Sequence, residues 1–227
     1  MKYRRLLTSL TSGYVRAVEC RGIEPSVGRP DIRQHLVNTV RSLQTSEWLR
    51  RDLSYYTNLY KRFIKETLKA PYSKTGYSPE VLAKVLTMSP FARLKNDVEG
   101  LRYIAELRTY IPTVVLDRDR VSYPLMLRKA LRHEVVPRFK SDLVLSGCEV
   151  VLADAANRVM YVLFSKVSRV HAVSRDTRNI TVISFGIPDL PKYSLGKAVR
   201  EFRDLVEMYY PDSVCVDVKP EDLRTIP

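Results

Sequence analysis

The chain is poor in the residues and motifs that usually mark an enzyme. Its 227 residues include eight glycines and three histidines. It has no glycine-rich phosphate loop, no G-x-S-x-G segment and no pair of histidines at helical spacing. His35, His133 and His171 stand alone, so each is expected to have a surface or structural role. The sequence therefore predicts a protein that is not an enzyme and that binds no metal.

Cysteines and long apolar runs are also scarce. Cys20, Cys148 and Cys215 are far apart and odd in number, which fits neither a disulfide framework nor a metal site. We expect them to be reduced, mostly buried thiols in a reducing compartment. No apolar run approaches the roughly 18 residues of a membrane-spanning helix, so no membrane span is expected.

Acidic residues are few in the first 140 residues. The net charge of +13 divides into +8 for residues 1–70, +6 for residues 71–140 and −1 for residues 141–227. A basic part beside a neutral part indicates a docking surface for nucleic acid, an acidic protein or an anionic membrane. Because the hydrophobic pattern changes at similar positions, we predict three segments: a three-helix bundle (1–70), a helical extension (71–140) and a small α+β module (141–227).

Two successive helices are predicted over residues 31–43 and 46–69, with Ser46 as the cap of the second. Each has one apolar stripe at three- and four-residue steps. The stripes consist of Ile32, Leu36, Val40 and Leu43, and of Leu49, Leu53, Tyr56, Tyr60, Phe63 and Ile64. Residues 2–18 favour a first helix of a basic antiparallel bundle. Alternatively they are a mitochondrial transit peptide, because they are rich in arginine and hydroxyl groups and contain no acid.

Further helices are expected at 79–87, 90–111 and 122–139, with one strand at 112–117. From residue 143 the period changes to that of strands, at 143–153, 158–165, 169–174 and 180–185, followed by a helix at 194–209 and a last strand at 213–218. The predicted fold class is α+β: a basic N-terminal three-helix bundle plus further helices, followed by a small C-terminal mixed sheet with one packed helix.

The polar faces of the second and third helices are strongly basic. Their cationic residues are Arg33, Arg41, Arg50, Arg51, Lys61, Arg62, Lys65 and Lys69. Tyrosines such as Tyr55 are interleaved with them, so Lys61, Arg62, Lys65 and Lys69 are candidate RNA contacts; the alternative is a solvated face with tyrosines in the core. Asp154 and Asp217, at strand ends, are candidate acids, although roles in a turn and at a strand end are favoured.

The first seventy residues resemble the LYR-motif family of small mitochondrial three-helix proteins. Tyr3 and Arg4 match the motif, with Lys2 in place of its leucine, and Arg33 and Arg41 fall at the second-helix arginines. The segment from His35 to Ile64 is most similar to the branch called formation of mitochondrial complexes, which shares the Thr-Ser-Glu that follows the basic run.

This resemblance implies a non-enzymatic accessory subunit or assembly factor of a large complex in the mitochondrial matrix, such as a respiratory complex, ATP synthase or the mitoribosome. Such proteins bind an acyl carrier protein. The implied contact residues are Tyr3, Arg4, Arg5, Arg33, Arg41, Arg50 and Arg51. No cofactor would be bound directly, but the acyl-phosphopantetheine of the carrier would enter the bundle. An RNA-contacting mitochondrial ribosomal accessory protein is the alternative.

Residues 179–224 are similar in layout to the opening of the TraB family. Gly186, Pro211-Asp212, Val214, Val216 and Arg224 match, whereas Asp217 replaces a glutamate and the turn histidine of that family is absent. This likeness implies a diverged TraB-like domain without activity as a further alternative.

Overall fold

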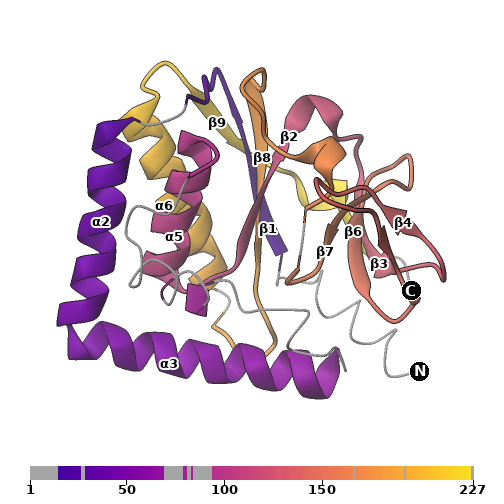
Figure 1. Cartoon of the computed structure of the whole chain (residues 1–227), viewed down its shortest axis with the longest axis horizontal. Coiled ribbons are helices and arrows are strands. Elements are labelled where there is room, and N and C mark those ends of the chain that lie inside the picture. The colour runs from indigo at the N-terminus through magenta and orange to yellow at the C-terminus, as the bar shows by residue number, and fades with distance from the viewer. Residues whose placement is uncertain are drawn as a thin grey trace.

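The computed structural model describes residues 15–26, 29–68, 79–80, 83, 94–165, 167–191 and 193–225. The described chain is an α+β protein in which helices lie on one side of a four-stranded sheet and a second sheet lies on the other side (Figure 1). The mixed α+β class predicted from the sequence is therefore confirmed, but its arrangement along the chain differs from the prediction.

The first sheet has the strand order β2 (Thr113–Asp117), β8 (Asn179–Phe185), β1 (Val15–Arg21) and β9 (Val214–Asp217), and all neighbours are antiparallel. Its central strands β8 and β1 are made largely of buried residues. β9 is an edge strand with exposed valines. The sheet thus combines strands from the beginning, the middle and the end of the chain.

Helices α5 (Asp97–Thr109) and α6 (Tyr193–Tyr209) lie between this sheet and α2 (Pro30–Thr45) (Figure 1). The side chain of Asn96 caps α5 by accepting a hydrogen bond from the Glu99 N–H. At Gly100, an added Cβ would lie 2.9 Å from the Ile32 Cγ2. The absence of a side chain at Gly100 therefore lets α2 approach α5 closely.

Helix α3 (Glu47–Arg62) begins at Ser46, whose side chain accepts from the Leu49 N–H as predicted, and continues as the π-helix η1 (Phe63–Thr67). It runs across one end of the layers, at a large angle to α2 (Figure 1). Tyr60 is fully buried; its hydroxyl donates to the Phe185 carbonyl at 2.7 Å, and its ring meets Phe164 edge to face. The buried face of α3 therefore packs against β8 of the first sheet and against Phe164, which follows β7 of the second sheet.

The second sheet has the order β10 (Leu223–Thr225), β3 (Leu125–Lys129), β6 (Val150–Ala153) and β7 (Val159–Val162). β10 and β3 are parallel and the other pairs are antiparallel. A two-stranded hairpin, β4 (Val135–Val136) and β5 (Leu143–Val144), lies beside it. Short 3₁₀ turns η2 (Arg118–Arg120), η3 (Arg169–His171) and η4 (Pro220–Asp222) join the elements.

Three secondary-structure predictions were wrong. Residues 15–18 are part of strand β1 rather than a helix, so the N-terminal three-helix bundle is not confirmed. Residues 122–139 contain β3 and β4 rather than a helix, and residues 169–171 form a 3₁₀ turn rather than a strand. In the first two cases the apolar spacing was short enough to fit either period, and pairing of β1 and β3 with distant strands decided the outcome.

The prediction of reduced cysteines was wrong for Cys20 and Cys215. Cys20 on β1 lies opposite Cys215 on β9, with the two Cα atoms 4.1 Å apart, and the two residues form a disulfide. Cys148 is exposed and takes no part in this bond. A sequence separation of 195 gave no sign of the pairing, because strand register is a tertiary property.

The expected segment boundaries at 70 and 140 do not coincide with a break in the sheets. β8 pairs with β1 and β2, which both precede residue 140, and β10 pairs with β3. One hydrophobic cluster extends from Val15 to Tyr210. Among the described residues, no helix has the length and apolar character needed to cross a membrane.

Candidate docking surface on helices α2 and α3

The basic residues predicted for partner binding lie on the outer faces of α2 and α3. Arg33 and Arg41 on α2 and Arg50 and Arg51 on α3 are all exposed. Arg41 is in the last turns of α2, close in sequence to the corner where α3 begins. The other predicted contacts, Tyr3, Arg4, Arg5 and Lys69, lie outside the described residues.

Intramolecular carboxylates engage only part of this charge. Arg51 pairs with Glu47 at 2.6 Å, Arg62 with Asp189 at 2.7 Å and Lys61 with Glu80 at 2.8 Å. These pairs are substantially exposed, so each is worth only about 0–1 kcal/mol and is readily exchanged for another anion. Among the cations that α2, α3 and η1 contribute to this surface, Arg33, Arg41, Arg50 and Lys65 make no ion pair with a described residue.

Two aromatic side chains stand on the same outer face of α3. Trp48 is 67% exposed and Tyr55 is 57% exposed. Trp48, Arg51, Tyr55 and Arg62 are spaced by three, four and seven residues, which places them along one line of a helix. Sequence reasoning had included Tyr55 but missed Trp48; its position, out of phase with the buried stripe, was the signal that could have found it. α3 therefore presents alternating aromatic and cationic groups.

The inner faces of the same helices are occupied. Ile32, Leu36 and Val40 of α2 and Tyr60 of α3 belong to the main hydrophobic cluster. A cavity of about 230 Å³ remains where α2, α3 and α5 meet, lined by Asn38, Thr39, Ser42, Leu43, Leu49, Leu107 and Arg108. It is smaller than the roughly 300–1,000 Å³ of small-molecule sites. The outer surface is thus the better candidate for binding than the interior.

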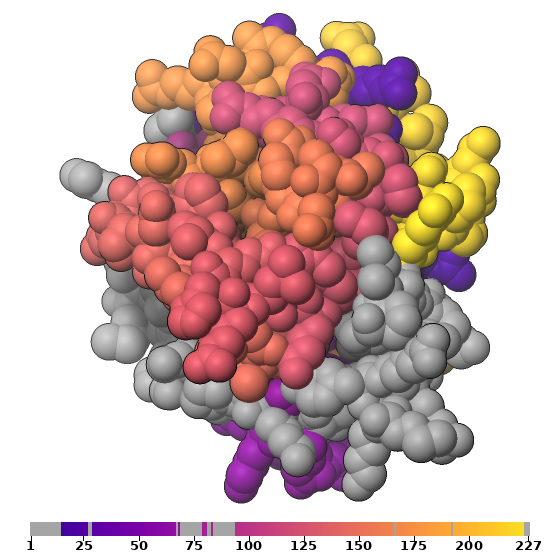
Figure 2. Space-filling view, turned by 90° about the vertical axis from the view of Figure 1, so that its right-hand side faces the viewer, coloured from indigo at the N-terminus to yellow at the C-terminus, as the bar shows by residue number. Residues whose placement is uncertain are grey.

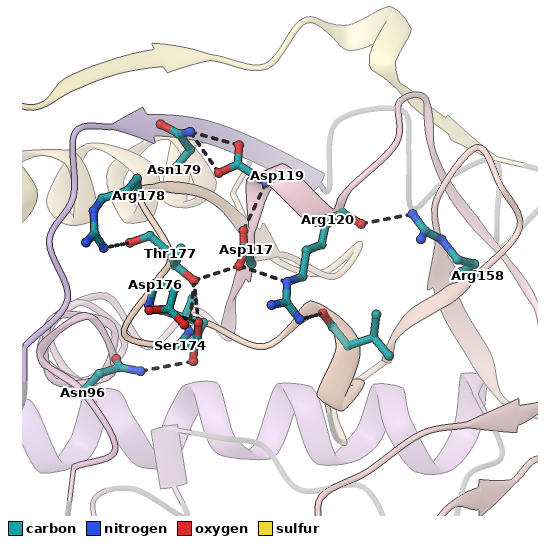
Figure 3. A network of polar contacts seen from close by, with 12 residues as sticks. Asn96, Asp117, Asp119, Arg120, Arg158, Ser174, Asp176, Thr177, Arg178 and Asn179 are labelled. Atoms are coloured by element: carbon teal, nitrogen blue, oxygen red, sulfur yellow. Dashed lines mark hydrogen bonds and ion pairs between the residues drawn. The ribbon is translucent and has the colours of Figure 1, made fainter.

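A second cluster of polar residues lies at the end of β2 and is shown in Figure 3. The Asp117 carboxylate accepts hydrogen bonds from the Thr177 hydroxyl at 2.8 Å and the Asp119 N–H at 3.1 Å, and it pairs with Arg120 at 3.4 Å. Arg120 in turn donates to the Val170 carbonyl at 3.1 Å. These bonds tie β2 to η3 and to the segment before β8. We interpret them as structural, because they occupy both oxygens of the carboxylate.

Asp154 has the turn-forming role favoured by the sequence. It is buried and accepts from the Arg158 N–H and Nε, both at 2.9 Å, which closes the turn between β6 and β7. Burial alone would raise the pKa of Asp154, but the hydrogen bonds from Arg158 outweigh burial and hold the pKa below its usual value. Asp217, the other candidate acid, is exposed and pairs with Arg203.

The three histidines differ in environment. The His35 ring bonds to the Tyr209 hydroxyl at 2.7 Å and to Arg108 at 2.6 Å, which links α2, α5 and α6. His133 is exposed, whereas His171 is 1% exposed and neither ring nitrogen has a hydrogen-bond partner in the described part of the chain. Burial first, then the nearby Arg158, lowers the pKa of His171, so its ring is neutral at neutral pH.

No protein-family model matches the sequence, and no curated protein matches it. Among solved structures, the chain is similar to an N-terminal fragment of the phenylalanyl-tRNA synthetase beta subunit from Pyrococcus horikoshii, with 13% sequence identity and a TM-score of 0.42. The alignment covers 59% of this chain and 44% of that chain. A likeness at this level supports no conclusion about family or function.

Proposed function

We propose that the protein is a non-catalytic accessory subunit or assembly factor of a large ribonucleoprotein complex, and that it binds RNA through the outer face of α3 and the adjoining turns of α2. The observation that carries this proposal is the line of Trp48, Arg51, Tyr55 and Arg62 on α3. Exposed aromatic rings can stack on unpaired bases, and neighbouring arginines can contact phosphates.

An acyl carrier protein is the other partner implied by the LYR resemblance. Arg33, Arg41 and Arg50 make no ion pair with the described residues and suit its acidic helix as well as they suit RNA. However, the apolar stripes of α2 and α3 pack inside this protein, so insertion of the acyl-phosphopantetheine between them has less support. Exposed Trp48 and Tyr55 favour RNA, because an acidic helix needs no stacking platform. We also propose a mitochondrial location, and its support is the resemblance of residues 1–70 to the LYR-motif family.

The proposal is tested by titrating the whole protein with fluorescently labelled single-stranded RNA. Trp48 is the single tryptophan of the chain, so quenching of its emission reports contact at α3 itself. We expect binding that weakens as salt rises. Trp48→Ala/Tyr55→Ala removes two stacking contacts, and at about 1 kcal/mol or more for each contact it should weaken binding at least tenfold, as measured by anisotropy. Arg50→Glu/Arg51→Glu should weaken it and reduce the salt dependence.

A matched control replaces two cations by glutamate on a surface away from α3. Arg175→Glu/Arg178→Glu alters two exposed cations just before β8, whereas Tyr60 of α3 bonds to Phe185 at the other end of that strand, about 20 Å away at the usual rise of a strand. We expect the RNA affinity of this variant to stay within about twofold of that of the original protein. The loss of one stacking contact would change the affinity by more. If the aromatic variant binds as well as the original while the α3 charge variant does not, stacking is excluded and an acidic protein becomes the better partner. If neither variant changes binding, α3 is not the site.

A further inference from the structure

The hairpin of β4 and β5 has an apolar outer surface at the far side of the molecule from α2. Val136 and Leu145 point inward and are buried in a small second hydrophobic cluster. Val135 and Val144, which are direct partners in the hairpin, are 50% and 59% exposed. In a half-buried hairpin the outward positions are normally polar, so two facing valines form an unusual surface.

The segments flanking the hairpin add two larger exposed apolar side chains. Leu131, just before the hairpin, is 57% exposed, and Phe139, in the connection between β4 and β5, is 64% exposed. We call Leu131, Val135, Phe139 and Val144 the hairpin patch. The part of the chain that contains it forms a lobe on the face shown in Figure 2. Four large exposed apolar side chains within fourteen consecutive residues indicate a surface that binds a partner.

Cations surround this patch. Arg132 adjoins Leu131, Arg138 and Lys140 adjoin Phe139, and the Lys95 ammonium lies 5.2 Å from the centre of the Phe139 ring. None of these four pairs with a carboxylate among the described residues. The same segment holds two acids: Glu134 is already bonded to Arg128, and Asp142 is exposed. The surface therefore combines apolar groups with an excess of positive charge.

We propose that the hairpin patch is a docking site for an anionic lipid surface. Phe139 supplies one ring, but the other three members of the hairpin patch are aliphatic and cannot stack on a base, which favours an acyl region over RNA at this position. A bilayer interface accepts apolar side chains in its acyl region, and the long arms of arginine and lysine reach its negative head groups. The protein would thus attach peripherally through the hairpin patch and keep α3 available on another side. This inference does not depend on the proposed function.

Vesicle co-sedimentation of the whole protein tests the proposal. We expect binding to vesicles of phosphatidylcholine with added phosphatidylglycerol, and little binding to phosphatidylcholine alone. Leu131→Ser/Phe139→Ser should abolish most of the binding. Arg132→Glu/Lys140→Glu should weaken it about tenfold or more, because it replaces two cations that the anionic surface attracts with two anions that it repels. Met208→Ser, at an exposed position on α6, is the apolar control and should bind as the original does.

A site-specific probe shows which surface enters the lipid. In a Trp48→Phe background, Phe139→Trp should shift its emission to the blue with anionic vesicles, whereas Trp48 in the original protein should not. Circular dichroism confirms that each variant is folded. Equal binding to neutral vesicles, unchanged binding by Leu131→Ser/Phe139→Ser, or no vesicle binding at all would overturn the proposal. So would a dimer in size-exclusion chromatography that this double variant disrupts, because a second copy would then cover the patch.

Discussion

At the residue scale, the structure separates charges that are already neutralised from those that remain available. The carboxylates of Asp117 and Asp154 are fully engaged by arginines, hydroxyls and backbone N–H groups. By contrast, Arg41 and Arg50 make no ion pair among the described residues. The sequence placed these arginines on exposed helical faces correctly. It gave no means of knowing that buried His171 would lie close enough to Arg158 to be affected by its charge.

His171 should make stability depend on pH. Its pKa is lowered in the folded protein by burial and by Arg158 and Arg120, against the opposing effect of Asp154 and Asp117. The unfolded chain therefore takes up a proton first, at about pH 6.5, so this contribution to stability is complete above that pH and is lost as the pH falls. We expect His171→Leu to remove the part of the decline that begins near about pH 6.5 and continues as the pH falls, measured by urea unfolding at a series of pH values.

The exposed His133 supplies the control for this experiment. His133→Gln should leave the pH profile of the original protein unchanged. The decline that remains in His171→Leu belongs to His35 and to carboxylates such as Asp154, which are present in every variant. A His171→Leu profile that coincides with the original at all pH values would show that the buried imidazole does not titrate in this range.

At the element scale, close helix packing depends on glycine at one position and not at another. A Cβ at Gly100 of α5 would lie 2.9 Å from the Ile32 side chain and 3.1 Å from the Leu94 side chain. A Cβ at Gly196 of α6 would meet nothing nearer than the Arg200 Nη1 at 3.4 Å. The same substitution should therefore have opposite effects in the two helices.

Gly100→Ala should lower the free energy of unfolding by about 1 kcal/mol, because the clash with α2 exceeds the gain in helix propensity. Gly196→Ala should raise it by about 0.5–1 kcal/mol through propensity alone. Urea unfolding of the two variants under one set of conditions measures both. Stabilisation by Gly100→Ala would mean that α2 can shift away from α5 at little cost.

At the scale of the whole molecule, the ends of the chain are joined in one sheet. β1 lies between β8 and β9, so a strand from residues 15–21 is inserted into the C-terminal strand–helix–strand unit. The C-terminal segment 141–227 therefore lacks the two strands that flank β8. The TraB-like layout of residues 179–224 is altered by the same insertion, because β8 and β9 are not neighbours.

The disulfide between Cys20 and Cys215 closes a loop that contains most of the chain. Cys20→Ala/Cys215→Ala should lower the free energy of unfolding by about 2–4 kcal/mol, because the unfolded chain then regains the freedom that the cross-link removes. Thiol titration of the unreduced protein should detect one cysteine, Cys148, and three after reduction and unfolding. Cys148→Ala is the stability control. Three reactive thiols before reduction would contradict the pairing.

The sequence by itself determined the elements whose periodicity is long and local. Helices α2, α3 and α6, strands β2 and β8 and the β6–β7 hairpin were predicted because apolar spacing, caps and turn residues act between near neighbours in the chain. The basic character of the outer faces of α2 and α3 followed from the same spacing.

Only the tertiary structure decided what depends on contacts between distant residues. Residues 15–21 became a strand because β8 and β9 supply hydrogen bonds on both sides, and Cys20 met Cys215 because of the resulting register. The exposure of the hairpin patch was also decided at this level. An apolar residue in the sequence does not reveal whether a neighbouring element covers it, and both proposed docking surfaces consist of residues that the fold leaves uncovered.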